Sequence, residues 1–127
     1  MNRKIYFILI ISFFYNTAFA DTFDDVAIAI KSANAKEVSK YFNSSVELTM
    51  IESEGVYSKQ QAEVILKNFF LQNPPSAVVI NHRGSSAQGA KYAIATYECP
   101  KGKFRAYIFM KDSGSGMLIQ ELRIEKE

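Results

Sequence analysis

The sequence is 127 residues long and carries 15 lysines and arginines, 13 aspartates and glutamates and a single cysteine. This length suits one domain. Two of the basic residues, Arg3 and Lys4, lie in an N-terminal segment that we expect to be removed, which leaves 13 basic and 13 acidic residues. A neutral domain without a basic cluster lacks the charge that a phosphate backbone requires, so we expect no nucleic-acid partner.

The first twenty residues have the three parts of a secretory signal peptide. A basic start ending at Lys4 precedes an apolar run over residues 5–15 (IYFILIISFFY), and residues 18–20 (AFA) match the pattern that signal peptidase reads. The apolar run is shorter than the roughly 20 residues of a membrane-spanning helix. We therefore expect a signal peptide over 1–20 and one mature domain over 21–127, in a periplasmic or secreted protein with no stable membrane span after cleavage.

Two helices are predicted at the start of the mature domain. Phe23, Val26 and Ile30 recur at helical spacing, which predicts a first helix capped by residue 21 or 22. A second apolar stripe predicts a helix over residues 35–42. The polar residues 43–45 are expected to end that helix, and the alternation over residues 46–52 predicts a strand.

A longer helix is predicted to begin at Ser58. Ser58 is followed three residues later by Gln61, the spacing of a capping box. Ile65, Leu66 and Phe69 then form an apolar stripe, and the two prolines at 74–75 end the helix.

Four strand-like segments complete the chain, and the short connections between them contain Gln88-Gly89, Lys101-Gly102 and a glycine-rich stretch over residues 112–116. Such connections favour antiparallel hairpins. Helices followed by consecutive hairpin-linked strands indicate an α+β fold, with helices on one face of a curved antiparallel sheet. The predicted strands cover residues 77–83, 91–99, 103–111 and 117–126.

Residues 34–42 (NAKEVSKYF) and 55–62 (GVYSKQQA) resemble segments of small exported bacterial domains of unassigned function in the nuclear transport factor two-like (cystatin-like) superfamily. The resemblance covers most of residues 22–126. It implies a cone-shaped sheet wrapped around helices, in the order α-α-β-α-β-β-β-β. It implies no particular chemistry, because the superfamily includes isomerases, dehydratases, binding proteins and dimerisation modules. The Gln-x-Val-x-Gly loop of active cystatin-type protease inhibitors does not occur in the chain.

The turns also predict which face each strand residue takes, because neighbouring residues of a strand point to opposite faces. With Lys101-Gly102 at a hairpin tip, Tyr97 pairs with Ala106 on the inner face, and Glu98 pairs with Arg105 on the outer face. His82 and Gln120 are expected to point inward. The outer face is expected to carry an apolar centre with a charged rim, which is typical of a surface that binds a second copy. The expected interface residues are Tyr92, Ile94, Tyr107, Phe109, Ile119, Arg105 and Arg123. The alternative is a solvated face stabilised by cross-strand pairs.

The inner face suggests a ligand pocket, for which the candidates are His82, Tyr97, Gln120, Met50 and Phe69. The leading hypothesis is a non-catalytic domain that binds a small apolar ligand or an envelope protein and possibly forms a homodimer. The alternative is a small isomerase- or hydrolase-like enzyme with His82 as general base and Tyr97 or Gln120 polarising a carbonyl. His82 is the one catalytic candidate, and no acidic residue is expected on the inner face of the last four strands to orient it.

Other reactive side chains are assigned no chemistry. Glu47, Glu52 and Glu54 lie near the first predicted strand without the spacing of a metal site, so neither a metal nor a cofactor is expected. Cys99 has no second cysteine with which to form a disulfide. A nucleophilic role for Cys99 would require a base within reach, and the predicted register does not place His82 there.

Overall fold

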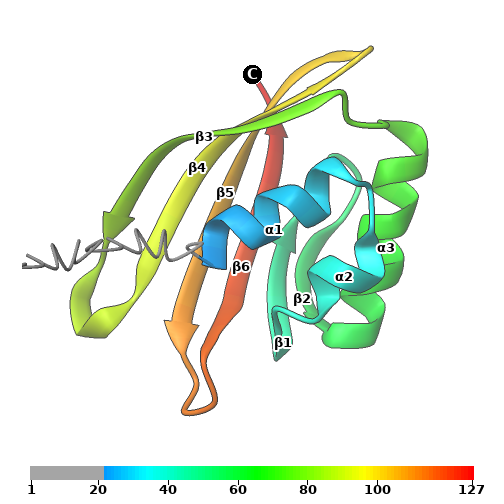
Figure 1. The fold of residues 1–127 in the computed structure, drawn as a ribbon. Coiled ribbons are helices and arrows are strands. Elements are labelled where there is room, and N and C mark those ends of the chain that lie inside the picture. Colours follow the sequence, from blue (N-terminus) through cyan, green and yellow to red (C-terminus); the bar gives the residue numbers. More distant parts are fainter. Residues whose placement is uncertain (1–21) are drawn as a thin grey trace, which may run out of the picture.

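The computed structural model describes residues 22–127 (Figure 1). The predicted signal peptide over residues 1–20 lies outside these described residues. Along these residues, three α-helices, one short 3-10 helix and six strands follow one another. The helices are α1 (Thr22–Lys31), α2 (Ala35–Ser39), α3 (Lys59–Gln72) and the 3-10 helix η1 (Ala87–Gly89). The strands are β1 (Phe42–Thr49), β2 (Glu54–Ser58), β3 (Ala77–Ser85), β4 (Lys91–Cys99), β5 (Gly102–Asp112) and β6 (Met117–Lys126).

The six strands form one curved sheet in the order β2-β1-β6-β5-β4-β3, and α1, α2 and α3 cover one of its faces (Figure 1). β1 pairs in parallel with β6, and the other neighbouring strands pair antiparallel. This confirms the expected α+β fold with a curved sheet around helices. β2 is a short strand just before α3.

The central helix α3 begins as the sequence predicts. The Ser58 hydroxyl accepts a hydrogen bond from the Gln61 amide at 3.2 Å, and the Gln61 side chain accepts one from the Ser58 amide at 3.2 Å. This is a complete capping box. Leu66 and Phe69 on the following turns are buried against the sheet. Local sequence alone therefore sets the start of this helix.

The second helix is shorter than expected. α2 ends at Ser39, and Phe42 opens β1 instead of closing a helix. Residues 43–45, which were expected to end the second helix, form part of β1, where Ser45 pairs with Ser58. Pairing with β6 also holds this segment, because the Ile119 amide donates to the Tyr41 carbonyl at 2.6 Å. Tertiary pairing thus overrides the local turn tendency.

The core lies between the helices and the concave face of the sheet. Tyr97, Phe104 and Ile108 of β4 and β5 are almost fully buried there. The ring of Phe69 from α3 lies 5.5 Å from that of Tyr97 and 5.6 Å from that of Phe104, between ring centroids. This aromatic cluster is how α3 covers the concave face, as its apolar stripe predicts.

The register between β4 and β5 differs from the expected one by two residues. The two-residue turn is Pro100-Lys101, so Cys99 pairs with Gly102 and Tyr97 with Phe104. Glu98 consequently pairs with Lys103, and the expected pair of Glu98 with Arg105 is wrong. A shift of two residues preserves the face of every side chain, so Tyr97 still points inward, as predicted.

Two β-bulges reverse faces that simple alternation had assigned. Between Ile80 and His82 the pairing with β4 shifts by one residue, so His82 pairs with Ile94. In β6 the pairing with β5 shifts between Glu121 and Ile119. Each bulge inserts one extra residue, which exchanges the two faces beyond it.

Candidate functional site

A cavity of about 370 Å³ opens at one end of the sheet. It lies between the turn joining β1 to β2, the last turns of α3, the β4–β5 hairpin and the end of β6, near the C-terminus marked in Figure 1. Ligand sites usually occupy concavities of about 300–1,000 Å³. The residues that line it are Met50, Ile51, Glu52, Ser53, Ile65, Asn68, Phe69, Gln72, Asn73, Lys101, Phe104 and Lys126.

The inner wall of this cavity is mostly apolar, with the buried Asn73 as its one polar member among the described residues, and its rim is mostly polar. Met50, Phe69 and Phe104 are buried, while Asn68 and Gln72 are exposed. Two of the five predicted pocket residues, Met50 and Phe69, therefore line one cavity. This arrangement can hold a molecule with an apolar body and leave its polar end near water.

The site was only partly predictable. Asn68 and Gln72 were not among the predicted pocket residues, although they lie three and seven residues after Ile65 on α3, with Phe69 between them. The spacing i, i+3, i+4, i+7 marks a single helix face, so it was a usable signal. Lys101 and Lys126 gave no such signal, because they come from distant hairpin and strand ends.

Tyr97 lies behind the cavity wall and does not line it. It is fully buried, and its hydroxyl donates a hydrogen bond to the carbonyl oxygen of Asn73, the residue that ends α3. Burial raises the pKa of the Tyr97 hydroxyl well above its usual range. The hydroxyl therefore holds the end of α3 against β4.

His82 points away from this cavity. It is exposed on the outer face, and its Nε2 atom lies 3.2 Å from the Tyr92 hydroxyl. The expectation that His82 faces inward is wrong, because the bulge at Asn81 turns it to the other face. His82 and Tyr97 thus lie on opposite faces of the sheet.

Gln120 is also separate from the other predicted pocket residues. Its side chain is half-buried and accepts a hydrogen bond from the Asn43 side-chain amide at 3.1 Å. It is the extra residue of the β6 bulge. On one side of it Glu121 pairs with Phe109, and on the other Ile119 pairs with Met110. The predicted grouping of His82, Tyr97 and Gln120 does not form.

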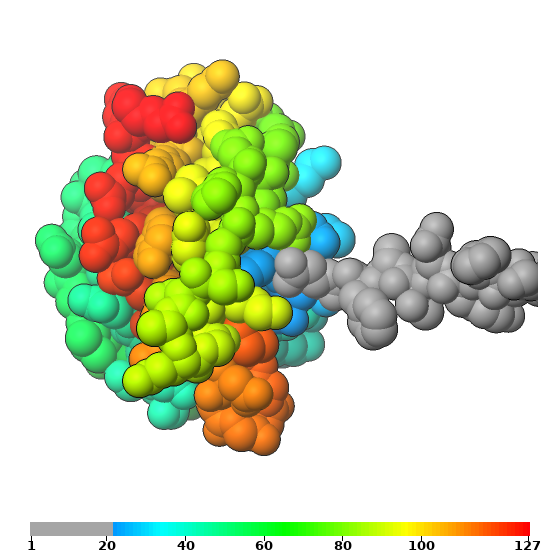
Figure 2. All heavy atoms as spheres, turned by 90° about the vertical axis from the view of Figure 1, so that its left-hand side faces the viewer, coloured from blue at the N-terminus to red at the C-terminus, as the bar shows by residue number. Residues whose placement is uncertain are grey.

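The outer face of the sheet carries a band of half-exposed aromatic residues. The rings of Tyr92 and Tyr107 stack with centroids 6.1 Å apart, and Ile94 on β4 pairs directly with Tyr107 on β5. Figure 2 looks onto the β3 side of the molecule, with the blue α1 on one side of this strand and β4, β5 and β6, in yellow to red, on the other. Phe109 lies on the same face as Tyr107 and is half-buried.

Charged groups flank this aromatic band. Arg123 forms an ion pair with Glu121 at 3.1 Å. Burial and the neighbouring Glu121 carboxylate raise the pKa of the Tyr107 hydroxyl. Arg105 is exposed nearby, as predicted. Ile119 does not belong to this face: it is fully buried in the core because the bulge in β6 turns it inward.

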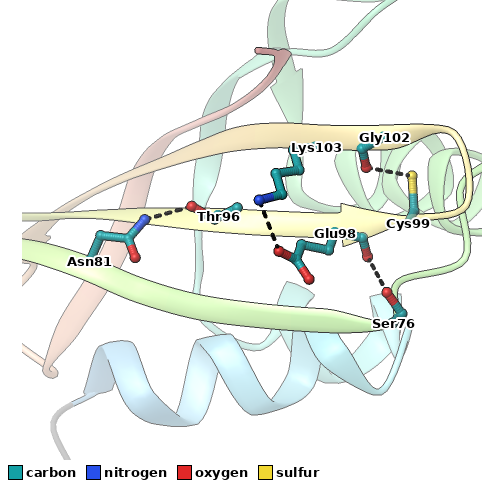
Figure 3. Close-up of polar contacts among 7 residues, drawn as sticks. All are labelled: Ser76, Asn81, Thr96, Glu98, Cys99, Gly102 and Lys103. Atoms are coloured by element: carbon teal, nitrogen blue, oxygen red, sulfur yellow. Dashed lines mark hydrogen bonds and ion pairs between the residues drawn. The ribbon is translucent and has the colours of Figure 1, made fainter.

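Polar pairs beside the β4–β5 hairpin also belong to the outer face (Figure 3). The Lys103 ammonium lies 3.5 Å from the Glu98 carboxylate, and the Asn81 side-chain amide donates to the Thr96 hydroxyl at 2.6 Å. Cys99 is buried on the other face, and its thiol lies 3.5 Å from the Gly102 carbonyl oxygen. His82 and Cys99 are therefore on opposite faces of the sheet.

Neither a metal centre nor a membrane helix is found in the described part of the chain. Within residues 22–127, no three histidine, cysteine, aspartate or glutamate side chains gather as metal ligands would. No helix between Thr22 and the C-terminus is long and apolar enough to cross a bilayer.

Comparisons with known proteins place the chain in a family. Residues 23–125 match the family model described as Domain of unknown function (DUF4783). The chain belongs to the DUF4783 family. No protein with a curated functional description matches it.

Solved structures agree with this assignment. A DUF4783 family protein from Bacteroides ovatus is 30% identical, with a TM-score of 0.75 over 81% of this chain and 93% of that one. A DUF4783 family protein from Bacteroides uniformis is 24% identical, with a TM-score of 0.78 over 84% and 98%. A domain of unknown function with a cystatin-like fold from Nostoc punctiforme is 7% identical, with a TM-score of 0.63 over 81% and 71%. This DUF4783 chain therefore has the nuclear transport factor two-like, cystatin-like fold, as its sequence suggested.

Proposed function

We propose that this DUF4783 protein is an exported, non-catalytic binding domain that holds a small ligand in the cavity between α3, the β1–β2 turn and the β4–β5 hairpin. The observation that carries the proposal is the cavity of about 370 Å³, with buried Met50 and Phe69 on its inner wall and amide side chains on its rim. Export is supported by the signal-peptide pattern of residues 1–20.

The position of the ionisable groups supports binding over catalysis. His82, the predicted general base, lies on the outer face and cannot reach a molecule in the cavity. The titratable side chains that line the cavity are Glu52, Lys101 and Lys126, and all three are exposed to water. Catalytic acids and bases are more often found where burial and neighbouring charges adjust them to their task.

A fragment screen followed by amide NMR tests this proposal. Small apolar fragments should shift the amide signals of Asn68 and Gln72 on the cavity side of α3. Asn68→Trp should abolish these shifts, because the indole would occupy the cavity. Lys67→Trp is the matched control: Lys67 is exposed on the same helix and does not line the cavity. Shifts that persist in Asn68→Trp would contradict the proposal.

We infer a second role for the outer face, which is contact with another copy of the chain. The half-exposed apolar band of Tyr92, Ile94 and Tyr107 is flanked by the Glu121–Arg123 pair. In a two-fold contact the same patch faces itself, so each copy would present both Arg123 and Glu121 to the other. Aromatic residues and arginine are the types enriched where such surfaces meet.

A further inference from the structure

The rim of the cavity carries two lysines whose ammonium groups have no ion-pair partner in the part of the chain that the structure describes. Lys101 lies in the turn of the β4–β5 hairpin and Lys126 at the end of β6, and both line the cavity. Neither takes part in an ion pair with any residue between 22 and 127. By contrast, Lys103, two residues from Lys101, lies 3.5 Å from the Glu98 carboxylate on the outer face.

The charge of the lining is positive by one unit. Besides the two lysines, the lining contains one acidic residue, Glu52, on the turn between β1 and β2. Glu52 forms no ion pair with either lysine. The ammonium groups of Lys101 and Lys126 are therefore free to meet an anionic group brought by a ligand, and a single negative charge would neutralise the lining.

The wall below this rim favours an apolar body of modest size. Met50 and Phe104 are buried, and Phe69 presents part of an aromatic ring to the cavity. Asn68 and Gln72 of α3 add side-chain amide donors at the opening of the cavity. A flexible methionine and two aromatic rings accommodate apolar groups of various shapes.

We propose that the cavity binds amphipathic monocarboxylates, with the apolar part against Met50, Phe69 and Phe104 and the carboxylate between Lys101 and Lys126. This inference rests on the proposed binding role of the cavity and names the class of its ligand. A charge-assisted contact with an ammonium is stronger than a neutral hydrogen bond, so the carboxylate supplies selectivity over neutral molecules of the same shape.

The test compares three probes that share one apolar body and differ in the end group: 4-phenylbutyrate, 4-phenylbutan-1-ol and 4-phenylbutan-1-amine. Amide NMR titration locates the binding and gives the affinity. We expect 4-phenylbutyrate to shift the Asn68 and Gln72 amides and to bind about tenfold more tightly than the alcohol, as one charge-assisted contact allows. The amine should bind more weakly than the alcohol.

Charge-removing variants complete the test. Lys101→Gln combined with Lys126→Gln should weaken phenylbutyrate binding to the level of the alcohol, whereas the control Lys103→Gln should leave it unchanged. Equal binding of acid and alcohol at the cavity, insensitive to the lysines, would overturn the carboxylate inference and leave the cavity as a binding site. Preferred binding of the amine would overturn it likewise. An absence of shifts at the cavity with all three probes would contradict both this inference and the proposed binding role.

Discussion

The Tyr92 ring lies directly over the backbone of Gly84, its pairing partner on the edge strand β3. A β-carbon at residue 84 would stand 2.5 Å from Cε1 of that ring, which is closer than atoms can approach. Only a residue without a side chain lets Tyr92 reach across β3 to His82, where its hydroxyl lies 3.2 Å from Nε2. Gly84 thus leaves the space in which the Tyr92 ring lies over the edge strand β3.

Gly84→Ala is expected to displace the Tyr92 ring and to lower the free energy of unfolding by about 1 kcal/mol, at the low end of overpacking costs because the ring can swing toward solvent. Urea unfolding measures the loss. The Tyr92→Ala background is the control: there the alanine at 84 meets no ring, so it should be neutral or slightly stabilising. An equal loss in both backgrounds would show that the ring is not the cause.

Tyr97→Phe should destabilise the protein by about 1–2 kcal/mol, because the buried Asn73 carbonyl loses its hydrogen-bond donor. The effect should appear as loosening of the end of α3, seen as faster amide hydrogen exchange there. Tyr57→Phe serves as the control, since Tyr57 is half-exposed and its hydroxyl takes part in none of the hydrogen bonds found between residues 22 and 127. A loss no larger than that of Tyr57→Phe would refute this role.

The raised pKa of Tyr97 also predicts a loss of stability at alkaline pH. In the unfolded chain a tyrosine ionises near pH 10, whereas burial keeps the Tyr97 hydroxyl protonated in the folded state. As pH rises past 10 the unfolded state therefore binds fewer protons than the folded state, and the free energy of unfolding falls. Tyr97→Phe should show a smaller fall between about pH 8 and about pH 11. Parallel curves for the two proteins would contradict the assignment.

Ser58→Ala removes one half of the capping box of α3 and should cost about 1 kcal/mol of unfolding free energy. Chemical denaturation followed by circular dichroism measures it. Ser85→Ala, at an exposed serine of β3 whose hydroxyl is in none of the hydrogen bonds of the described chain, should change stability by less than about half that amount. If the two variants are equally stable, the cap contributes nothing.

Sedimentation of the protein at increasing concentration tests the contact through the outer face. The wild-type chain should form dimers, and Tyr107→Glu should be monomeric, because a carboxylate in the aromatic band opposes its burial against a second copy. Glu63→Gln, on the helical side of the molecule, is the control and should still dimerise. A wild-type protein that stays monomeric at tens of micromolar would remove this proposal.

Features set by neighbouring residues in the sequence were predictable. The Ser58 cap depends on residues three apart, and β4 alternates cleanly between buried and more exposed residues, so its bounds match the structure. The face of Ile119 was not predictable, because one inserted residue in β6 reverses it and no local signal marks that bulge. His82 was misplaced for the same reason.

The cavity shows the same limit. Met50 and Phe69 were found because large apolar residues near strand and helix ends are natural pocket walls. Lys101 and Lys126 were missed because they meet only when the β4–β5 hairpin and the end of β6 are placed beside α3. The polar residues at the rim of a cavity can therefore be identified only when the folded structure is known.

The central claim is that the cavity binds a small ligand. Native mass spectrometry of the protein purified from its own host tests it most directly, because a ligand bound in the cell would add its mass to that of the protein. The account predicts that the wild-type protein and Lys67→Trp carry an additional small-molecule mass and that Asn68→Trp, with the cavity filled, does not. A bound mass that remains in Asn68→Trp, or no bound mass in the wild-type protein, would contradict it.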